Sequence, residues 1–595
     1  MIRKRLKAVT SVLAFFLCGV PVWYHMTSLN RGALPLDEMR EHLGRGFQAL
    51  PVTVRLWLCT DRLAGGGAVA AADAQVARIL AAMESAGVRP LDHEGLRVVA
   101  TWVGPSGCAS ADPLRLLCGH RALGCALPPE ACPDVFRVLE GPEHAGDAFL
   151  QEALEAELER AGIASSPGSY DVFLLDALAL EGPGSNGVTK LQLVLGGGRT
   201  AWLLSPMWQP DGAFSGTAAQ AAAHAAALFS FGRQEPLPAH GLPLLRSGSL
   251  KLLASLCVAD PPSGACRWDA AWLEGAALRP LLRALEPLGA VEVESQVLLY
   301  TRPREEGAWD PAAGAYALER RQLPFFVDPE WNLEPDRAVV AGAAGAEDTL
   351  HLVGFVPAPQ QRPLTVRGAD DGGVLPSFSV ESWGAVALLN LLPQGCCEEW
   401  GEGNATGRCT RHGALEKHHL LLLARALASE LRLSLGLSNS PALSFPGGLK
   451  ARYAFAEREA FAEWEVDALA RHQVKMAANA TANTLASLAS LLQKLSNLPV
   501  PDEVVELVEE SLHALRKANA SSDDLFQCAR NARLARAAAD SAFFHPSIMA
   551  EHNYPLQHLV AMYMPYFLPV LVQLARAAAS ELLHWRRGKG SQKAA

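Results

Sequence analysis

The spacing of apolar and polar residues divides the chain into a long strand-rich part and a later helical part. From about residue 51 to 392, short apolar runs alternate with helical stretches such as 71–87 and 273–289. The predicted strands are VTVRLWL, LRVVATWV, YDVFLLDALAL, KLQLVLG, TAWLLS, VEVESQVLLY, HLVGFV and AVALLNLL. Most are continuously apolar, which is typical of strands covered on both faces. The alternation therefore predicts an α/β fold.

The pattern becomes helical from residue 454 to 542. Its clearest apolar stripe has three- and four-residue spacing, at Leu485, Leu488, Leu492 and Leu495. Such spacing places the side chains on one helix face. The next helical segment begins with acidic residues at 502 and ends with basic ones at 516 and 517, an order that suits the helix dipole. Internal packing is the simplest role for the stripe, and a surface for a partner is the alternative.

Two apolar segments near the ends of the chain predict membrane spans. The first, 9–26, follows several basic residues and has no small-x-small cleavage pattern, so an uncleaved signal anchor is favoured over a signal peptide. The second, 556–576, holds an uncharged run from 559 to 575 that contains Pro565 and Pro569 and precedes a basic tail. Membrane helices tolerate proline better than soluble ones. A buried helix of a soluble domain is the alternative.

Basic residues on the outer flank of each segment place both chain ends in the cytosol under the positive-inside rule. The predicted fold class is a membrane protein with two transmembrane helices, in which a large luminal α/β region is followed by a helical segment. The predicted parts are a cytosolic N-tail 1–8, transmembrane helix 1 at 9–26, the luminal α/β region 27–450, the luminal helical segment 451–545, transmembrane helix 2 at 556–576 and a cytosolic basic C-tail 577–595.

Composition narrows the class of partners and the compartment. The 595 residues carry a formal net charge of −10 with no basic block, which argues against nucleic acid as a partner. Three glycosylation sequons begin at Asn404, Asn479 and Asn519. Together with the predicted anchor they favour the lumen of the endoplasmic reticulum. The disulfide candidates, whose connectivity sequence alone does not give, are Cys108, Cys118, Cys125, Cys132, Cys396, Cys397 and Cys409.

A search for catalytic, cofactor and metal motifs predicts no such site. A GxGxxG stretch at 182–187 is followed by a strand instead of the helix that a dinucleotide site needs, so we interpret it as a hairpin loop. The sequence lacks a P-loop, a GxSxG elbow, HExxH and CxxC. Cys257 and His351 are the pair considered for nucleophilic catalysis, and a structural role is favoured for both.

Several stretches, in order along the chain, resemble the PIG-S family, a subunit of the glycosylphosphatidylinositol (GPI) transamidase. They are GVPVWYHMTSLNRGALPLDEM, LARHQVKMAANATANTLASLASLLQKLSNLPVPDEVVELV and AADSAFFHPSIMAEHNYPLQHLVAMYMPYFLPVLVQL, with weaker matches between the first and the second. The cysteine-bearing stretches near 103–134 and 396–409 do not map onto the family.

The resemblance implies a non-catalytic subunit in the endoplasmic reticulum membrane. In that family the complex cleaves C-terminal signals and attaches GPI anchors to precursor proteins. The catalytic cysteine is expected in the caspase-like PIG-K subunit, and the implied partners are PIG-K, PIG-T, PIG-U and the GAA-type subunit. The alternatives are a luminal membrane-tethered hydrolase or transferase and a general scaffold or chaperone.

Overall fold

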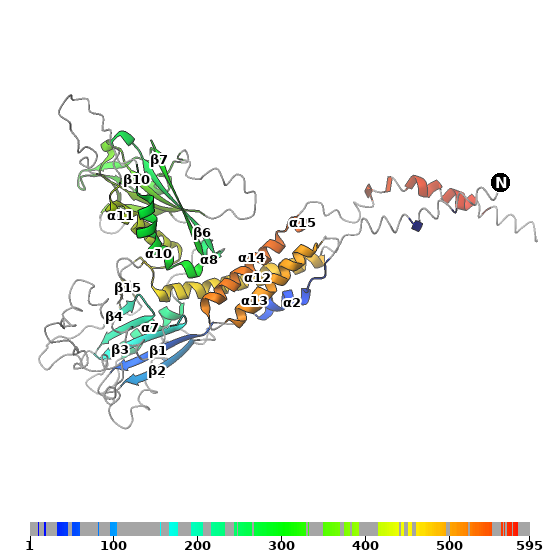
Figure 1. Ribbon diagram of the computed structural model, residues 1–595, viewed down its shortest axis with the longest axis horizontal. Coiled ribbons are helices and arrows are strands. Elements are labelled where there is room, and N and C mark those ends of the chain that lie inside the picture. Colours follow the sequence, from blue (N-terminus) through cyan, green and yellow to red (C-terminus); the bar gives the residue numbers. More distant parts are fainter. Residues whose placement is uncertain are drawn as a thin grey trace, which may run out of the picture. The chain divides into compact units, whose positions relative to one another are not determined.

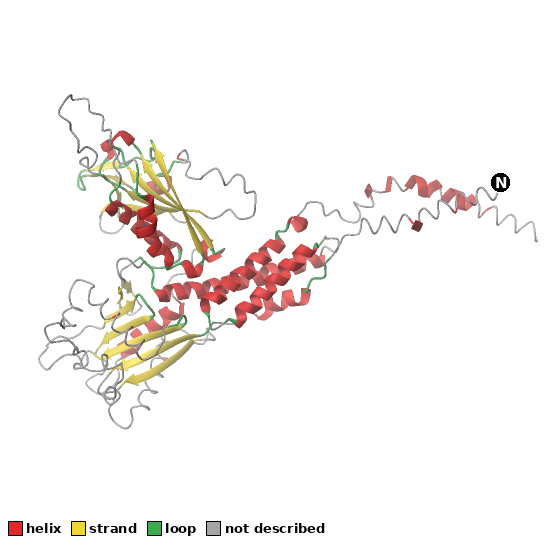
Figure 2. Cartoon of the chain, in the orientation of Figure 1, coloured by secondary structure: helices red, strands yellow, loops and turns green. Residues whose placement is uncertain are grey.

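The computed structural model describes part of the chain, and all structural statements below concern that part. The described residues are 10, 17–18, 32–45, 50–59, 81, 96–103, 151, 155, 166–176, 192–205, 216–231, 243–246, 248–263, 267–328, 331, 349–368, 374–380, 383–391, 415–439, 442–444, 450–454, 460–494, 500–521, 524–549, 561–562, 564–565, 568–573, 575–580 and 583. Figures 1 and 2 show the chain coloured by sequence position and by secondary structure.

By its contacts the chain divides into two units. One unit comprises Met1–Phe47, Ala477–Lys517 and Leu534–Ala595, and the other comprises Gln48–Met476 and Ala518–Arg533. All described strands belong to the second unit, which we call the sheet unit; the first is called the helical unit. The domain boundaries predicted from composition stay predictions.

A seven-stranded sheet forms one part of the sheet unit, in the order β15-β16-β4-β5-β3-β1-β2. Its strands are β1 (Val52–Cys59), β2 (Leu96–Val103), β3 (Ser169–Asp176), β4 (Gln192–Gly196), β5 (Thr200–Ser205), β15 (Ala442–Ser444) and β16 (Lys450–Ala454). Helix α7 (Gly216–Phe231) packs on it, and its alanines at 221–223, 225 and 226 are buried against strand residues. Because alanine is small, the helix can lie close to the sheet. The ring of Phe229 stacks on Tyr170 of β3, with centroids 4.9 Å apart.

A second, five-stranded sheet has the order β13-β14-β10-β6-β7. Its strands are β6 (Ser249–Val258), β7 (Ala290–Leu299), β10 (Thr349–Val356), β13 (Ser377–Val380) and β14 (Gly384–Leu388). All neighbours are parallel except β13 and β14. The chain therefore enters at the interior strand β6, adds β7 on one side and then crosses to the central strand β10 on the other.

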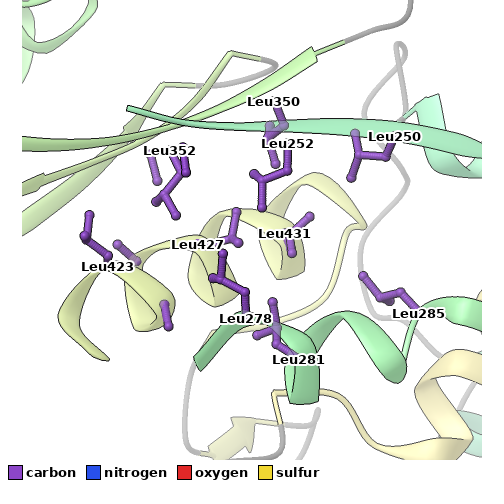
Figure 3. Packing of buried hydrophobic residues seen from close by; sticks show 14 of the residues in the cluster. Leu250, Leu252, Leu278, Leu281, Leu285, Leu350, Leu352, Leu423, Leu427 and Leu431 are labelled. Carbon is purple, nitrogen blue, oxygen red and sulfur yellow. The ribbon is translucent and has the colours of Figure 1, made fainter. Parts of the chain in front are cut away.

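Leucines from strands and helices fill one face of this sheet (Figure 3). Leu252 of β6 and Leu352 of β10 point toward Leu427 of α11 (Lys417–Ser434), and Leu281 of α10 (Arg279–Arg283) joins the same cluster. Each fully buried leucine stabilises the fold by about 1.5–3 kcal/mol. The remaining short elements here are α8 (Pro243–Arg246), η5 (Pro261–Ser263), α9 (Ala270–Trp272), the π-helical turn η6 (Leu273–Leu278), η7 (Glu286–Leu288) and η11 (Pro359–Gln361).

The opposite face packs on a small four-stranded sheet ordered β12-β11-β9-β8 and on the 3-10 helix η8 (Arg320–Phe325). The strands are β8 (Ala308–Asp310), β9 (Ala315–Leu318), β11 (Leu364–Arg367) and β12 (Val374–Leu375). Phe326 is the centre of this aromatic core, with ring contacts to Trp331, Phe355 and Phe378.

The helical unit holds α2 (Leu36–Arg45), most of α13 (Asp502–Ala520) and α15 (Pro546–Met549). The unit boundaries fall inside α12 (Glu463–Lys494) and α14 (Leu525–Phe543). Three residues of the predicted leucine stripe are confirmed as internal packing, because Leu485, Leu488 and Leu492 are buried with Val504 of α13, whereas Leu495 lies outside the described residues. The predicted charge order of α13 is also confirmed, with acidic residues in its first turn and Lys517 in its last.

The prediction of two transmembrane helices is wrong. Among the described residues, no helix combines the length and hydropathy needed to cross a membrane. Within the second predicted span the described helical residues are 561–562, 564–565, 568–573 and 575–576. An apolar run alone does not specify one long helix, and Pro565 and Pro569 each lack the N–H that a regular helix uses. The supported fold is mixed α/β with C-terminal helices.

Candidate functional site

Cys257 and His351 lie on neighbouring parallel strands but at opposite ends of them. Cys257 is next to last in β6 and is paired with Phe355, whereas His351 is near the start of β10 and is paired with Leu253. Four strand positions separate the two pairs, a distance of about 13 Å. A nucleophile and its base must lie within hydrogen-bonding reach. The two residues therefore do not form a nucleophile–base pair.

The surroundings of each residue indicate a packing role. Cys257 is fully buried in the aromatic core, and burial raises the pKa of its thiol to about 12. The thiol is therefore protonated at neutral pH, whereas the thiolate is the nucleophile. The ring of His351 stacks on Trp383, with centroids 4.9 Å and planes 17° apart.

The carboxyl ends of parallel strands are where open α/β sheets commonly bind ligands. In the five-stranded sheet this position lies between β6 and β10, whose connections lead to opposite sides. Here the two strands stay bonded beyond their ends, because the Ala259 amide donates to the Val356 carbonyl at 3.0 Å. The aromatic core around Phe326 packs on the same ends. The described residues thus fill the position with core side chains.

Polar side chains near these ends bind backbone. Arg362 donates to the carbonyls of Pro357 at 2.7 Å and Leu391 at 3.1 Å. The amide of Asn390 exchanges two 2.8 Å hydrogen bonds with the backbone of Leu364. These contacts hold the loop after β10 against β11 and the chain that follows β14.

A highly connected polar cluster in the sheet unit lies on the first turns of α12. We call it the α12 anchor; it comprises Tyr170, Arg199, Glu463, Asp467 and Arg471. Asp467 is fully buried and accepts hydrogen bonds from Arg199 Nε at 2.6 Å and Nη2 at 2.9 Å. Glu463 accepts from Arg199 Nη1 at 2.6 Å. Burial alone would lower the pKa of Arg199, but the hydrogen bond and charge of Asp467, with the charge of Glu463, raise it.

Tyr170 and Arg471 complete the α12 anchor. The Tyr170 hydroxyl donates to Asp467 at 3.2 Å and accepts from Arg471 Nη1 at 2.5 Å. Arg471 also donates to the Phe229 carbonyl at the end of α7, at 2.5 Å. Burial raises the pKa of Tyr170 to about 12, so the hydroxyl is protonated at neutral pH and can donate its hydrogen bond to Asp467. The anchor therefore joins α12 to β3, to the loop before β5 and to α7.

The same helical segment also binds the part of the unit that contains the five-stranded sheet. Gln473 donates to the carbonyls of Leu244 and Leu288, both at 3.0 Å. Arg432 of α11 makes two 2.9 Å bonds to the buried carboxylate of Glu465. Within the sheet unit, the segment 463–476 is thus bonded to β3 of the seven-stranded sheet and to the helical elements α8, η7 and α11.

The sequence search missed the α12 anchor. The available signal was Asp467 and Arg471, four residues apart in a segment where Ala468, Leu469 and Ala470 are apolar. An acid and a base at that spacing share a helix face. Their burial and their partners depend on strands and loops far away in the sequence.

The predicted modification sites fall at different places. Asn404, all seven disulfide candidates and the GxGxxG stretch lie outside the described residues. Asn479 is exposed in the middle of α12, but Thr481 of its sequon is buried and its hydroxyl donates to the Ala477 carbonyl at 2.8 Å. Asn519 is exposed near the end of α13.

Comparisons with known proteins give one consistent relationship. The family model described as PIG-S, phosphatidylinositol-glycan biosynthesis class S protein, matches residues 238–588. A mouse (Mus musculus) protein named GPI-anchor transamidase component PIGS is 28% identical over 341 residues, 56% of this chain and 57% of the relative. The bovine (Bos taurus) protein of the same name is 28% identical over 352 residues, 58% of this chain and 59% of the relative. A Schizosaccharomyces pombe protein named GPI transamidase component PIG-S homolog is 23% identical over 325 residues, 54% of this chain and 51% of the relative.

The matched region contains the five-stranded sheet, the small sheet and helices α11 to α15, whereas β1 to β5 precede it. The chain spans between 51% and 59% of the length of these three relatives.

Proposed function

Because the chain belongs to the family of phosphatidylinositol-glycan biosynthesis class S proteins, we propose that it is a component of a GPI transamidase. The observation that carries this proposal is the family match over 238–588, which includes two complete sheets and the C-terminal helices. In this role the chain supports the cleavage of C-terminal signals and the attachment of GPI anchors. The proposal includes association with the endoplasmic reticulum, where that reaction takes place.

We further propose that the chain is a non-catalytic component. Support comes from Cys257, whose buried thiol is protonated at neutral pH and lies about 13 Å along the strands from His351. The α12 anchor supports a structural role as well, since the buried carboxylate of Asp467 accepts hydrogen bonds from Arg199 and Tyr170, and Arg471 donates to the Phe229 carbonyl. The nucleophile then belongs to the caspase-like PIG-K subunit, and the other partners are PIG-T, PIG-U and the GAA-type subunit.

The test uses cells that lack their own copy of this subunit. The full chain is expressed in them, and two quantities are measured: GPI-anchored protein at the cell surface and transamidase subunits recovered with the chain after mild detergent extraction. We expect both to be restored. Failure of the wild-type chain to recover any transamidase subunit would exclude the proposed role.

Two substitutions separate a supporting component from an enzyme. Cys257→Ala and His351→Ala should lower surface anchoring only as far as they lower the amount of assembled complex. Loss of a catalytic group removes orders of magnitude of rate while the protein stays folded. A variant that assembles normally and abolishes anchoring would instead support the luminal hydrolase or transferase alternative.

A further inference from the structure

One long edge of the five-stranded sheet is open. Strand β7 lies at the end of the strand order and pairs only with β6 among the described residues (Figure 1). All ten of its residues are exposed or half-buried. The edge has no proline or lysine, two of the features with which proteins usually prevent unwanted strand pairing. We call the side of β7 that faces away from β6 the β7 edge.

The register identifies the backbone groups of the β7 edge. The Ala290 amide donates to the Gly248 carbonyl at 2.9 Å, so Ala290 directs its backbone toward β6. In a strand the amide and carbonyl of successive residues alternate between the two sides. The residues whose backbone groups face outward are therefore Val291, Val293, Ser295, Val297 and Leu299. An extended peptide backbone satisfies such a row of donors and acceptors by adding a strand.

The side chains of β7 determine which types of residue an added strand needs. On the face that also bears the leucine core, Val297 and Leu299 are 39% and 47% exposed. On the other face stand Glu292, which is exposed, and Glu294, which pairs with Lys251 at 2.9 Å. An added strand would therefore place apolar residues beside Val297 and Leu299 and basic residues beside Glu292.

We propose that the β7 edge binds an extended segment of another transamidase subunit, with apolar and basic residues alternating along that segment. This rests on the proposed function. A second copy of the chain fits less well, because β7 itself, AVEVESQVLL, has no basic residue to place beside Glu292. The segment can be up to ten residues long, because Tyr300, with a φ of 62°, ends the regular strand.

The first test is Ser295→Pro in the full chain, compared with Ser295→Val. Proline lacks the outward amide hydrogen but leaves the bonds to β6 in place, and edge strands tolerate it at such positions. Loss of one hydrogen bond predicts about three- to tenfold less of the partner subunit recovered. Ser295→Val keeps the amide and should recover the wild-type amount. Unchanged recovery with Ser295→Pro would overturn the proposal.

A second variant covers the outcome that the proline disturbs folding. Glu292→Lys changes an exposed side chain and should reduce recovery of the partner subunit several-fold, because it reverses the charge beside the added strand. Glu510→Lys, an equally exposed glutamate on α13, is the matched control and should have no effect. Equal recovery with both lysine variants would contradict the proposed chemistry.

Hydrogen exchange then locates the contact. The outward-facing amides of the 290–299 segment should exchange rapidly in the free chain and at least tenfold more slowly in the assembled complex. Equal exchange in both states, or protection already present in a dimer of the free chain seen by light scattering, would overturn the choice of partner. Failure of the wild-type chain to recover transamidase subunits would instead count against the proposed function itself.

Discussion

Replacing Asp467 by asparagine tests whether the α12 anchor holds the helix in place. The change keeps the size of the side chain but removes the charge that faces Arg199. In the native protein the side chain of Asp467 is 0% exposed and that of Arg199 is 11% exposed. The guanidinium would then remain buried with only Glu463, whose side chain is 58% exposed, as a charged partner.

The expected cost is large because the remaining charge cannot return to water. Breaking a buried ion pair by removing one partner typically costs about 3–5 kcal/mol. Removing both charges, as in Arg199→Met with Asp467→Leu, leaves no buried charge without a partner. The double variant should therefore be more stable than Asp467→Leu alone, a non-additive result that a double-mutant cycle detects.

Hydrogen exchange of the 463–476 peptide in the full chain is the measurement. It reports local opening and does not assume that the whole protein unfolds in one step. We expect Asp467→Asn to speed exchange of this peptide by about 100-fold or more, since each 1.4 kcal/mol corresponds to a factor of ten.

The control is a surface ion pair of similar geometry. Arg367 and Asp310 lie 2.7 Å apart, but their side chains are 52% and 21% exposed. Asp310→Asn should have little effect, because exposed pairs contribute little to stability. If Asp467→Asn changes local exchange no more than Asp310→Asn does at its own site, the anchor does not hold α12.

Three further predictions follow from the burial of single residues. Because the pKa of Cys257 is raised to about 12 from 9.0, its thiol favours the folded state below pH 9, and this stability is lost between pH 9 and 12. Unfolding midpoints at pH 8 and pH 10.5 should therefore differ less in Cys257→Ala than in the wild type. Leu488→Asp places a charge in the core of the helical unit and should destabilise that unit by several kcal/mol. Leu534 is 50% exposed, so Leu534→Asp should cost about 0.5 kcal/mol or less. Urea unfolding measures both changes. Of the described sequons, Asn519 should accept glycan and Asn479 should not, because the Thr481 hydroxyl is buried. The test uses chains that already carry Asn404→Gln. Glycosidase should shift the mobility of such a chain with Asn479→Gln but not of one with Asn519→Gln.

The sequence predicted eight strands, most of which are apolar runs. All eight predicted runs contain a strand of the structure: β1, β2, β3, β4, β5, β7, β10 and β14. Strand β6, which lies between β10 and β7, was not among them, and this interior strand contains the polar residues Ser249, Lys251 and Ser255. The structure resolves this conflict by pairing: Lys251 bonds Glu294, and the buried Ser255 hydroxyl accepts from Gln296. Neighbouring strand β7 supplies both partners, which a single run of sequence does not contain.

The α12 anchor could not be predicted from the sequence for a related reason. Asp467 meets Arg199 across 268 positions of sequence, and Arg471 meets Tyr170 across 301. A helix face with one acid and one base is equally compatible with a solvated surface. Only the packing of β3 and the loop before β5 against α12 decides that these charges are buried together.

The contacts of the α12 anchor cross the start of the region that the family model matches. Its contacts to Asp467 come from Tyr170 and Arg199, which precede the matched residues 238–588. The seven-stranded sheet crosses the same boundary, because β16 lies within the match and pairs with β4, which lies before it. Without β1 to β5, the matched region would leave Asp467 without Tyr170 and Arg199, and β16 without its neighbour β4. A buried carboxylate in that state costs several kcal/mol, comparable to the stability of a whole domain. Folding of the matched region therefore depends on the whole seven-stranded sheet, although the family match does not include β1 to β5.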